Sequence, residues 1–220
     1  MNDLIWSFSP WVLFLLANRF TSFSGAVALG LVAGLVVAAR AIGHHHLHLL
    51  DVASVLYFTG LGLALEIVHP TSVVYWSRYA QAGSHAFLTL IVLGSVVIGH
   101  PFTESYAKET TPKEVWGTAQ FRAVNRQISL VWGLAFLVGT ISLIIAGSVT
   151  GRPFLLRILI PFGALAYAYS YTQRVITARR GAAAGAAGAA GAAGTAGGAA
   201  GGAAPGTGSG GGAEPADPTT

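Results

Sequence analysis

The residues best suited to chemistry are the histidines, four of which fall in one short segment: His44, His45, His46 and His48. Neutral imidazole nitrogens bind zinc, copper and nickel, so this segment is a candidate metal site. A short run of histidines has no preset tetrahedral geometry, however, and Asp51 is the one carboxylate near it. The alternative is a solvated loop that becomes partly cationic at acid pH. We therefore predict no bound metal or cofactor.

The remaining histidines, together with His48, raise the alternative of a haem protein. Pairing His48 with His100 and His69 with His85 across two antiparallel helices would supply the axial ligands of two haems. His85 and His100 are ~22 Å apart along a helix, whereas His48 and His69 are ~31 Å apart. An interval of ~31 Å places His48 and His69 at or beyond the edges of a hydrocarbon core of ~30 Å. The spacing therefore argues against haem.

A carboxylate and an imidazole also lie three residues apart, at Glu66 and His69. Side chains three apart share one face of a helix, so the pair could relay a proton or bind a cation. The alternative is that both side chains reach the membrane surface and are hydrated. The sequence contains no cysteine and no phosphate loop, nucleophile elbow or HExxH motif, so we predict that the protein is not an enzyme.

The composition explains where these residues must lie. The chain of 220 residues is 53% apolar and only 9% charged, against roughly 25% charged residues in soluble domains. A membrane span needs ~20 mostly apolar residues. We predict an all-α, polytopic membrane domain over residues 1–180 with about six spans, at about 4–20, 23–41, 50–68, 82–99, 128–147 and 153–174. Of these, 4–20 is short and contains Pro10, so it spans the membrane or only re-enters it.

Positive charges predict the orientation of the helices, because Lys and Arg are enriched in cytoplasmic loops. Six spans put eight of the twelve basic residues on one side: Arg40, Lys108, Lys113, Arg122, Arg126, Arg174, Arg179 and Arg180. The other four are Arg19, Arg78, Arg152 and Arg157. We therefore expect a cytoplasmic C-terminus. The formal net charge of +4 fits anionic lipid better than nucleic acid, so we predict no nucleic-acid partner.

Two segments outside the spans have their own patterns. In 101–127, Thr111-Pro112-Lys113-Glu114 has the form of a capping box, which predicts an interfacial helix running through Trp116 toward the fifth span. The alternative is an ordinary solvated connector. Residues 181–220 consist largely of Gly and Ala, and we predict that they form a disordered tail because they cannot bury a core.

The order of several motifs is similar to that of a known family. Asn18-Arg19 ends the first apolar segment, Tyr75-Trp76-Ser77-Arg78 precedes the fourth, and Pro101-Phe102 opens the polar loop. The loop continues through Glu114-Val115-Trp116 to Asn125 and Trp132-Gly-Leu-Ala-Phe136. Over about residues 4–146 this order resembles the intracellular septation protein A family of bacterial inner-membrane proteins. The histidine loop and the Gly/Ala tail depart from that pattern.

The resemblance implies a multi-pass protein of the bacterial plasma (inner) membrane that supports cell-envelope or septum assembly. Its partners would be the lipid bilayer and other membrane proteins of the envelope or division machinery, and a homo-oligomer is compatible with it. We predict an interaction or anchoring surface at Trp116, Asn125, Arg126 and Trp132. The alternatives are a small proton- or cation-coupled transporter using Glu66 and His69, and a haem-binding electron-transfer protein.

Overall fold

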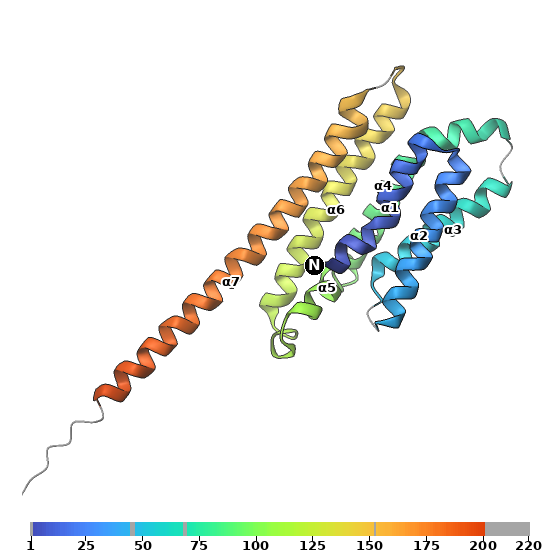
Figure 1. The fold of residues 1–220 in the computed structure, drawn as a ribbon. Coiled ribbons are helices and arrows are strands. Elements are labelled where there is room, and N and C mark those ends of the chain that lie inside the picture. The colour runs from blue at the N-terminus through green and yellow to red at the C-terminus, as the bar shows by residue number, and fades with distance from the viewer. Residues whose placement is uncertain (1, 45–46, 68–69, 152, 201–220) are drawn as a thin grey trace, which may run out of the picture. The chain divides into compact units, whose positions relative to one another are not determined.

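The computed structural model is helical in every regular element of the residues it describes, which are 2–44, 47–67, 70–151 and 153–200 (Figure 1). The α-helices are α1 (Asn2–Phe20), α2 (Phe23–Gly43), α3 (Leu49–Ile67), α4 (Pro70–Val97), α5 (Thr103–Thr110), α6 (Ala119–Ser148) and α7 (Ile160–Ala200). A short 3₁₀ helix, η1 (Lys113–Val115), precedes α6, and a π-helical turn, η2 (Leu155–Leu159), precedes α7. Residues 1–173 form one compact unit and residues 174–220 a second. The predicted all-α class is confirmed for the described residues.

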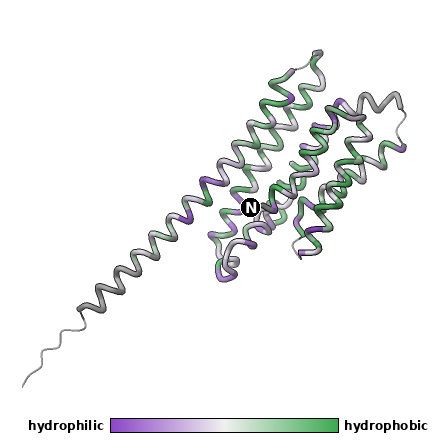
Figure 2. Tube along the Cα trace, in the orientation of Figure 1, coloured by the Kyte–Doolittle hydropathy of each residue, from purple (hydrophilic) through white to green (hydrophobic). Residues whose placement is uncertain are grey.

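Among the described residues, four helical segments are long and apolar enough to cross a membrane: Phe23–Gly43, Leu49–Ile67, Ser77–Val97 and Ala119–Ser148. They match the second to fifth predicted spans. The first predicted span is a shorter apolar helix, Asp3–Asn18, and the sixth contains the π-helical turn and is not among the four. Figure 2 shows hydrophobic residues along much of these helices, and many of their large apolar side chains are exposed. These features indicate a membrane protein.

Glycines allow α2 to lie close against α3. An added Cβ at Gly30 would stand 2.7 Å from Cε1 of Phe58, and one at Gly34 would stand 3.1 Å from the Ser54 hydroxyl. Phe58 is fully buried and also contacts Trp11 of α1, with ring centroids 5.2 Å apart. The small residues of the second predicted span therefore serve packing within the chain, as close helix contacts in membranes generally require.

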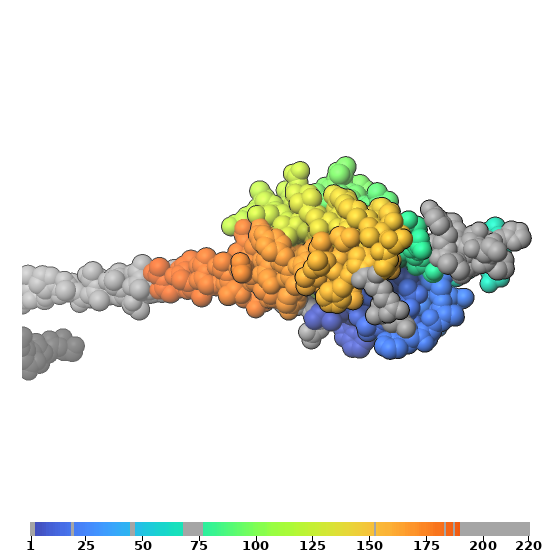
Figure 3. Space-filling view, turned by 90° about the horizontal axis from the view of Figure 1, so that it is seen from above, coloured from blue at the N-terminus to red at the C-terminus, as the bar shows by residue number. Residues whose placement is uncertain are grey.

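Glycines also allow α6 to lie close against α4. Gly133 faces Leu93, and Gly139 faces the imidazole of His85, whose Cδ2 would lie 2.6 Å from an added Cβ. Helix α6 then connects to the start of α7, where the Trp132 indole N–H donates to the Thr172 hydroxyl at 3.0 Å. The space-filling view shows α6 and the start of α7, in yellow to orange, beside each other (Figure 3).

The helix predicted to have Thr111 as its cap begins seven residues later, with Thr118 as its cap. Thr111 and Pro112 are extended, and only the 3₁₀ turn follows them. Helix α6 starts at Ala119 because the Thr118 hydroxyl accepts a hydrogen bond from the Phe121 N–H at 3.2 Å. The capping-box prediction was therefore wrong in position: the competing cap follows Gly117, a poor helix former. A separate helix, α5, lies earlier in the same loop.

The tail also differs from the prediction as far as Ala200. We predicted disorder from residue 181, whereas α7 remains helical through Ala200. Alanine has the highest helix propensity of any residue, and a helix begun by the preceding turns can be extended without a new nucleation step. Residues 201–220 lie outside the described part of the chain.

Candidate functional site

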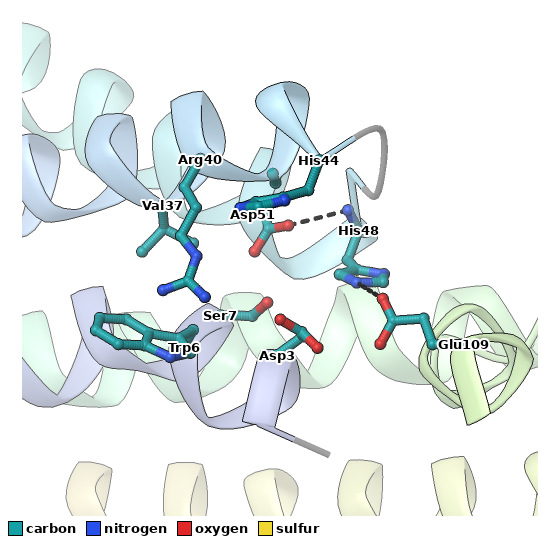
Figure 4. Close-up of a pocket in the computed structure, with 10 residues that line it drawn as sticks. Asp3, Trp6, Ser7, Val37, Arg40, His44, His48, Asp51 and Glu109 are labelled. Atoms are coloured by element: carbon teal, nitrogen blue, oxygen red, sulfur yellow. Dashed lines mark hydrogen bonds and ion pairs between the residues drawn. The ribbon is translucent and has the colours of Figure 1, made fainter.

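A polar pocket of about 290 Å³ lies where the ends of several helices meet (Figure 4). Its walls come from the first turns of α1, the end of α2, the start of α3 and the end of α5. The lining residues are Asp3, Trp6, Ser7, Val37, Arg40, Ala41, His44, His48, Asp51 and Glu109. Three of the eight acidic residues of the chain are therefore gathered in one place. With the predicted orientation, this is the cytoplasmic end of the helices.

His48 links α3 to α5. Its Nε2 lies 2.7 Å from Oε1 of Glu109, and its ring stacks on Tyr106 with centroids 4.0 Å apart. The side chains of His48 and Glu109 are only 5% and 14% exposed. Tyr106 and Glu109 are three residues apart on one face of α5, which is why both can contact the same imidazole. A charge change on His48 would thus act directly on the contact between two helices.

Asp51 is the most deeply buried acid of the pocket, at 1% exposed. As the third residue of α3, it reaches back so that its Oδ2 accepts the His48 backbone N–H at 3.0 Å, which caps the helix. Its other oxygen, Oδ1, is buried without a hydrogen-bond partner. Figure 4 shows this oxygen directed into the pocket, toward Ser7 and Arg40. A buried carboxylate oxygen without a hydrogen-bond partner from the protein is costly, so this position favours a donor placed in the pocket.

Arg40 does not neutralise these acids by direct contact. Its guanidinium lies over the indole of Trp6, 4.7 Å from the ring centroid, and makes no ion pair with Asp3, Asp51 or Glu109. Three carboxylates therefore face one fixed positive charge. Unless the imidazoles are protonated, the pocket is net negative and favours a cationic occupant.

The pKa of the Tyr106 phenol reflects how deeply this region is buried. Desolvation is the main cause that raises the pKa of the Tyr106 phenol well above its ordinary value, because burial penalises the phenolate. The carboxylates of Asp51, Glu109 and Asp3 raise it further. The Ser7 hydroxyl opposes the shift in part, although the phenol oxygen does not meet strict hydrogen-bond geometry.

The histidine segment is divided by the fold. His44 is exposed at the C-terminal cap of α2, whereas His48 is buried. His45 and His46 lie outside the described residues. Within the described part of the chain, no three metal-ligating side chains come close enough to hold an ion.

The structure does not support the predicted haem ligand pair of His48 and His100. His100 is exposed, and the neighbours of His48 are Tyr106 and Glu109. His85 is held by the Gln81 carbonyl, 3.1 Å from its Nδ1, and packs on α6. The structure therefore gives His48 a carboxylate in place of the predicted His100 partner. His69 lies outside the described residues, so its pairing with His85 stays a prediction.

The predicted Glu66–His69 relay falls partly outside the described residues, because His69 is not among them. Glu66 itself is exposed near the end of α3. The carboxylate–imidazole contact that the structure does contain is that of His48 with Glu109.

The predicted surface at Trp116, Asn125, Arg126 and Trp132 is not one surface. Asn125 and Trp132 are buried, at 3% and 6% exposed, so they cannot contact a partner in this arrangement. Trp116 is half-buried and donates to the Thr111 carbonyl at 2.9 Å, while Arg126 is exposed. Asn125 and Trp132 instead serve helix packing, a role compatible with the anchoring that was predicted as the alternative to partner contact.

Sequence reasoning missed Asp3, Glu109 and Tyr106. All three lie far from His48 in the sequence, and no sequence motif relates residues of α1 to residues of α5. The available signal was rarity, since the chain has only eight acidic residues.

Together, the fold and the pocket define a helical protein whose described residues contain four candidate membrane-spanning helices and an acidic pocket at helix ends. Comparison of the chain with protein-family models, curated proteins and solved structures finds no match.

Proposed function

We propose that the protein is a small membrane transporter coupled to protons or another cation, and that the pocket around Asp51 is its cation site. The observation that carries the proposal is the buried, unpartnered Oδ1 of Asp51, which faces a pocket with two further carboxylates. Ionisable side chains buried near membrane depth are costly, and they are commonly kept for ion or proton pathways. This site replaces the predicted one at Glu66 and His69.

His48 is the group through which protonation would act. Imidazole is the side chain that changes charge nearest to neutral pH. A protonated imidazole would attract the Glu109 carboxylate as a full ion pair, whereas a neutral one keeps only the 2.7 Å contact, which lacks hydrogen-bond geometry. The link between α3 and α5 would therefore depend on proton binding. Proton binding and helix position are thereby coupled.

The proposal includes a membrane topology. The apolar α1 and the segment at 153–174 would complete six spans, with 101–127 at the membrane surface. The excess of basic residues supports a cytoplasmic position for this loop, for the pocket and for the C-terminus. The membrane would be the plasma membrane of a bacterium.

The test is charge movement in reconstituted membranes. We expect wild-type protein in liposomes on a solid-supported membrane to give a transient current after a pH jump. Asp51→Asn and Glu109→Gln should each reduce that current several-fold. Glu104→Gln is the matched control, since Glu104 lies on the same helix as Glu109, is equally buried and pairs with Lys108 at 2.7 Å outside the pocket. No wild-type current, or equal currents in all variants, would refute the proposal.

A second proposal is the role in envelope or septum assembly that the motif order suggests. Exposed Arg126, early in α6, and half-buried Trp116, on the connection that leads into α6, support it because both remain accessible. The expected result is defective division or envelope-stress resistance in a deletion strain, restored by the wild-type gene but not by Arg126→Glu. Normal growth of the deletion strain under both conditions would count against it.

A further inference from the structure

We infer that the ligand of the pocket is a small compound with a primary ammonium group, which Asp51 and Asp3 bind. This inference rests on the proposed cation site and names its ligand class. The first observation is a hydrogen-bond acceptor without a donor. Asp51 is 1% exposed, and its Oδ1 has no hydrogen-bond partner. A charged donor in front of it would remove the cost of burying that oxygen.

The arrangement of acceptors favours an ammonium. In Figure 4 the Asp51 carboxylate, the Ser7 hydroxyl and the Asp3 carboxylate surround one side of the pocket. A primary ammonium has three N–H donors, which matches three separate acceptors from two helices. A metal ion holds its ligands closer, at roughly 2.0–2.6 Å instead of the ~2.9 Å of an N–H···O bond, and the described residues provide no three His, Cys, Asp or Glu side chains close enough to hold one.

The aromatic wall argues against a quaternary ammonium. Such cations are recognised chiefly by the faces of aromatic rings. The Trp6 face is already covered by the Arg40 guanidinium at 4.7 Å, and Tyr106 stacks on His48. The pocket therefore offers hydrogen-bond acceptors and negative charge, but no free aromatic cage.

Size and charge limit the remaining choice. A volume of about 290 Å³ is at the lower end of the range for ligand pockets, which suits a short alkylamine or a lipid headgroup amine. Three carboxylates against one guanidinium leave negative charge for a monocation to balance. The guanidinium of Arg40 would stay with Trp6 and restrict the ammonium to the side of Asp51.

The experiment is saturation-transfer NMR on the full chain in nanodiscs of phosphatidylcholine and phosphatidylglycerol, with n-butylamine as the probe. We expect butylamine to bind, and tetramethylammonium and 1-butanol not to compete with it. Asp51→Asn should weaken binding about tenfold or more, because it removes a charge-assisted hydrogen bond. The Asn oxygen can still accept the His48 N–H, so the helix cap is retained. Glu104→Gln should bind as wild type does.

A further arm distinguishes the source of the amine. Adding phosphatidylethanolamine to the nanodiscs should displace butylamine if the natural ligand is a lipid headgroup, and should leave it bound if the ligand is free in solution. The inference is overturned if butylamine does not bind, if tetramethylammonium competes equally well, or if Asp51→Asn binds as wild type does. A pH-jump current that depends on Asp51 without butylamine binding would overturn this ligand and leave the cation site intact.

Discussion

The contact between Gly30 and Phe58 allows a quantitative test of how α2 and α3 pack. A methyl group at Gly30 would stand 2.7 to 2.9 Å from three atoms of the Phe58 ring, whereas ordinary contact begins near 3.4 Å. The ring would have to retreat by about 0.7 Å. Phe58 has no room for this movement, since it is fully buried and contacts the rings of Trp11, Phe14 and Tyr57.

We expect Gly30→Ala to lower the free energy of unfolding by about 1–2 kcal/mol. Overpacking a filled core costs about 1–3 kcal/mol. The higher helix propensity of alanine returns up to about 1 kcal/mol. Gly60→Ala is the matched control on α3, because an added Cβ there meets nothing within 4 Å. That variant should be unchanged or slightly more stable.

The assay is equilibrium unfolding in mixed micelles, followed by far-UV circular dichroism over a series of SDS fractions. Phe58→Leu in the Gly30→Ala background should recover part of the lost stability, because the smaller side chain makes room for the methyl group. A non-additive double mutant would locate the strain at this contact. Equal stability of Gly30→Ala and Gly60→Ala would refute the close packing of α2 on α3.

Three more predictions concern other parts of the first unit. Thr118→Ala should lower stability by about 1 kcal/mol by removing the cap of α6, whereas Thr111→Ala should have little effect; both are measured by the same unfolding assay. The raised pKa of Tyr106 means that the folded protein keeps the phenolic proton after the unfolded chain releases it near pH ~10. Stability should therefore fall as pH rises through ~10, and Tyr106→Phe should reduce that fall; an identical pH dependence in the variant would contradict this assignment. A double-mutant cycle of Trp132→Phe and Thr172→Val should give a coupling energy of about 0.6 kcal/mol for their hydrogen bond, and zero coupling would show that the bond contributes nothing to stability.

Much of the fold follows from local properties of the chain. Length and hydropathy belong to each segment separately, which is why the second to fifth predicted spans match the four candidate helices. Small residues in an apolar helix allow close packing, and Gly30 of α2 does so against Phe58 of α3. The start of α6 was missed because the prediction placed the cap at Thr111, whereas the structure caps the helix at Thr118.

The sequence by itself therefore determined an all-helical chain with helices of membrane-spanning length and charges placed mainly between them. Only the tertiary structure decided which of the rare polar residues form a site. Asp3, Arg40, Asp51 and Glu109 come from four different helices, and His48 contacts Glu109 across 61 positions of sequence. These residues come together only when the helices pack side by side with their ends at the same level. Contacts between helices arise from the shapes of whole faces and leave no fixed spacing in the sequence.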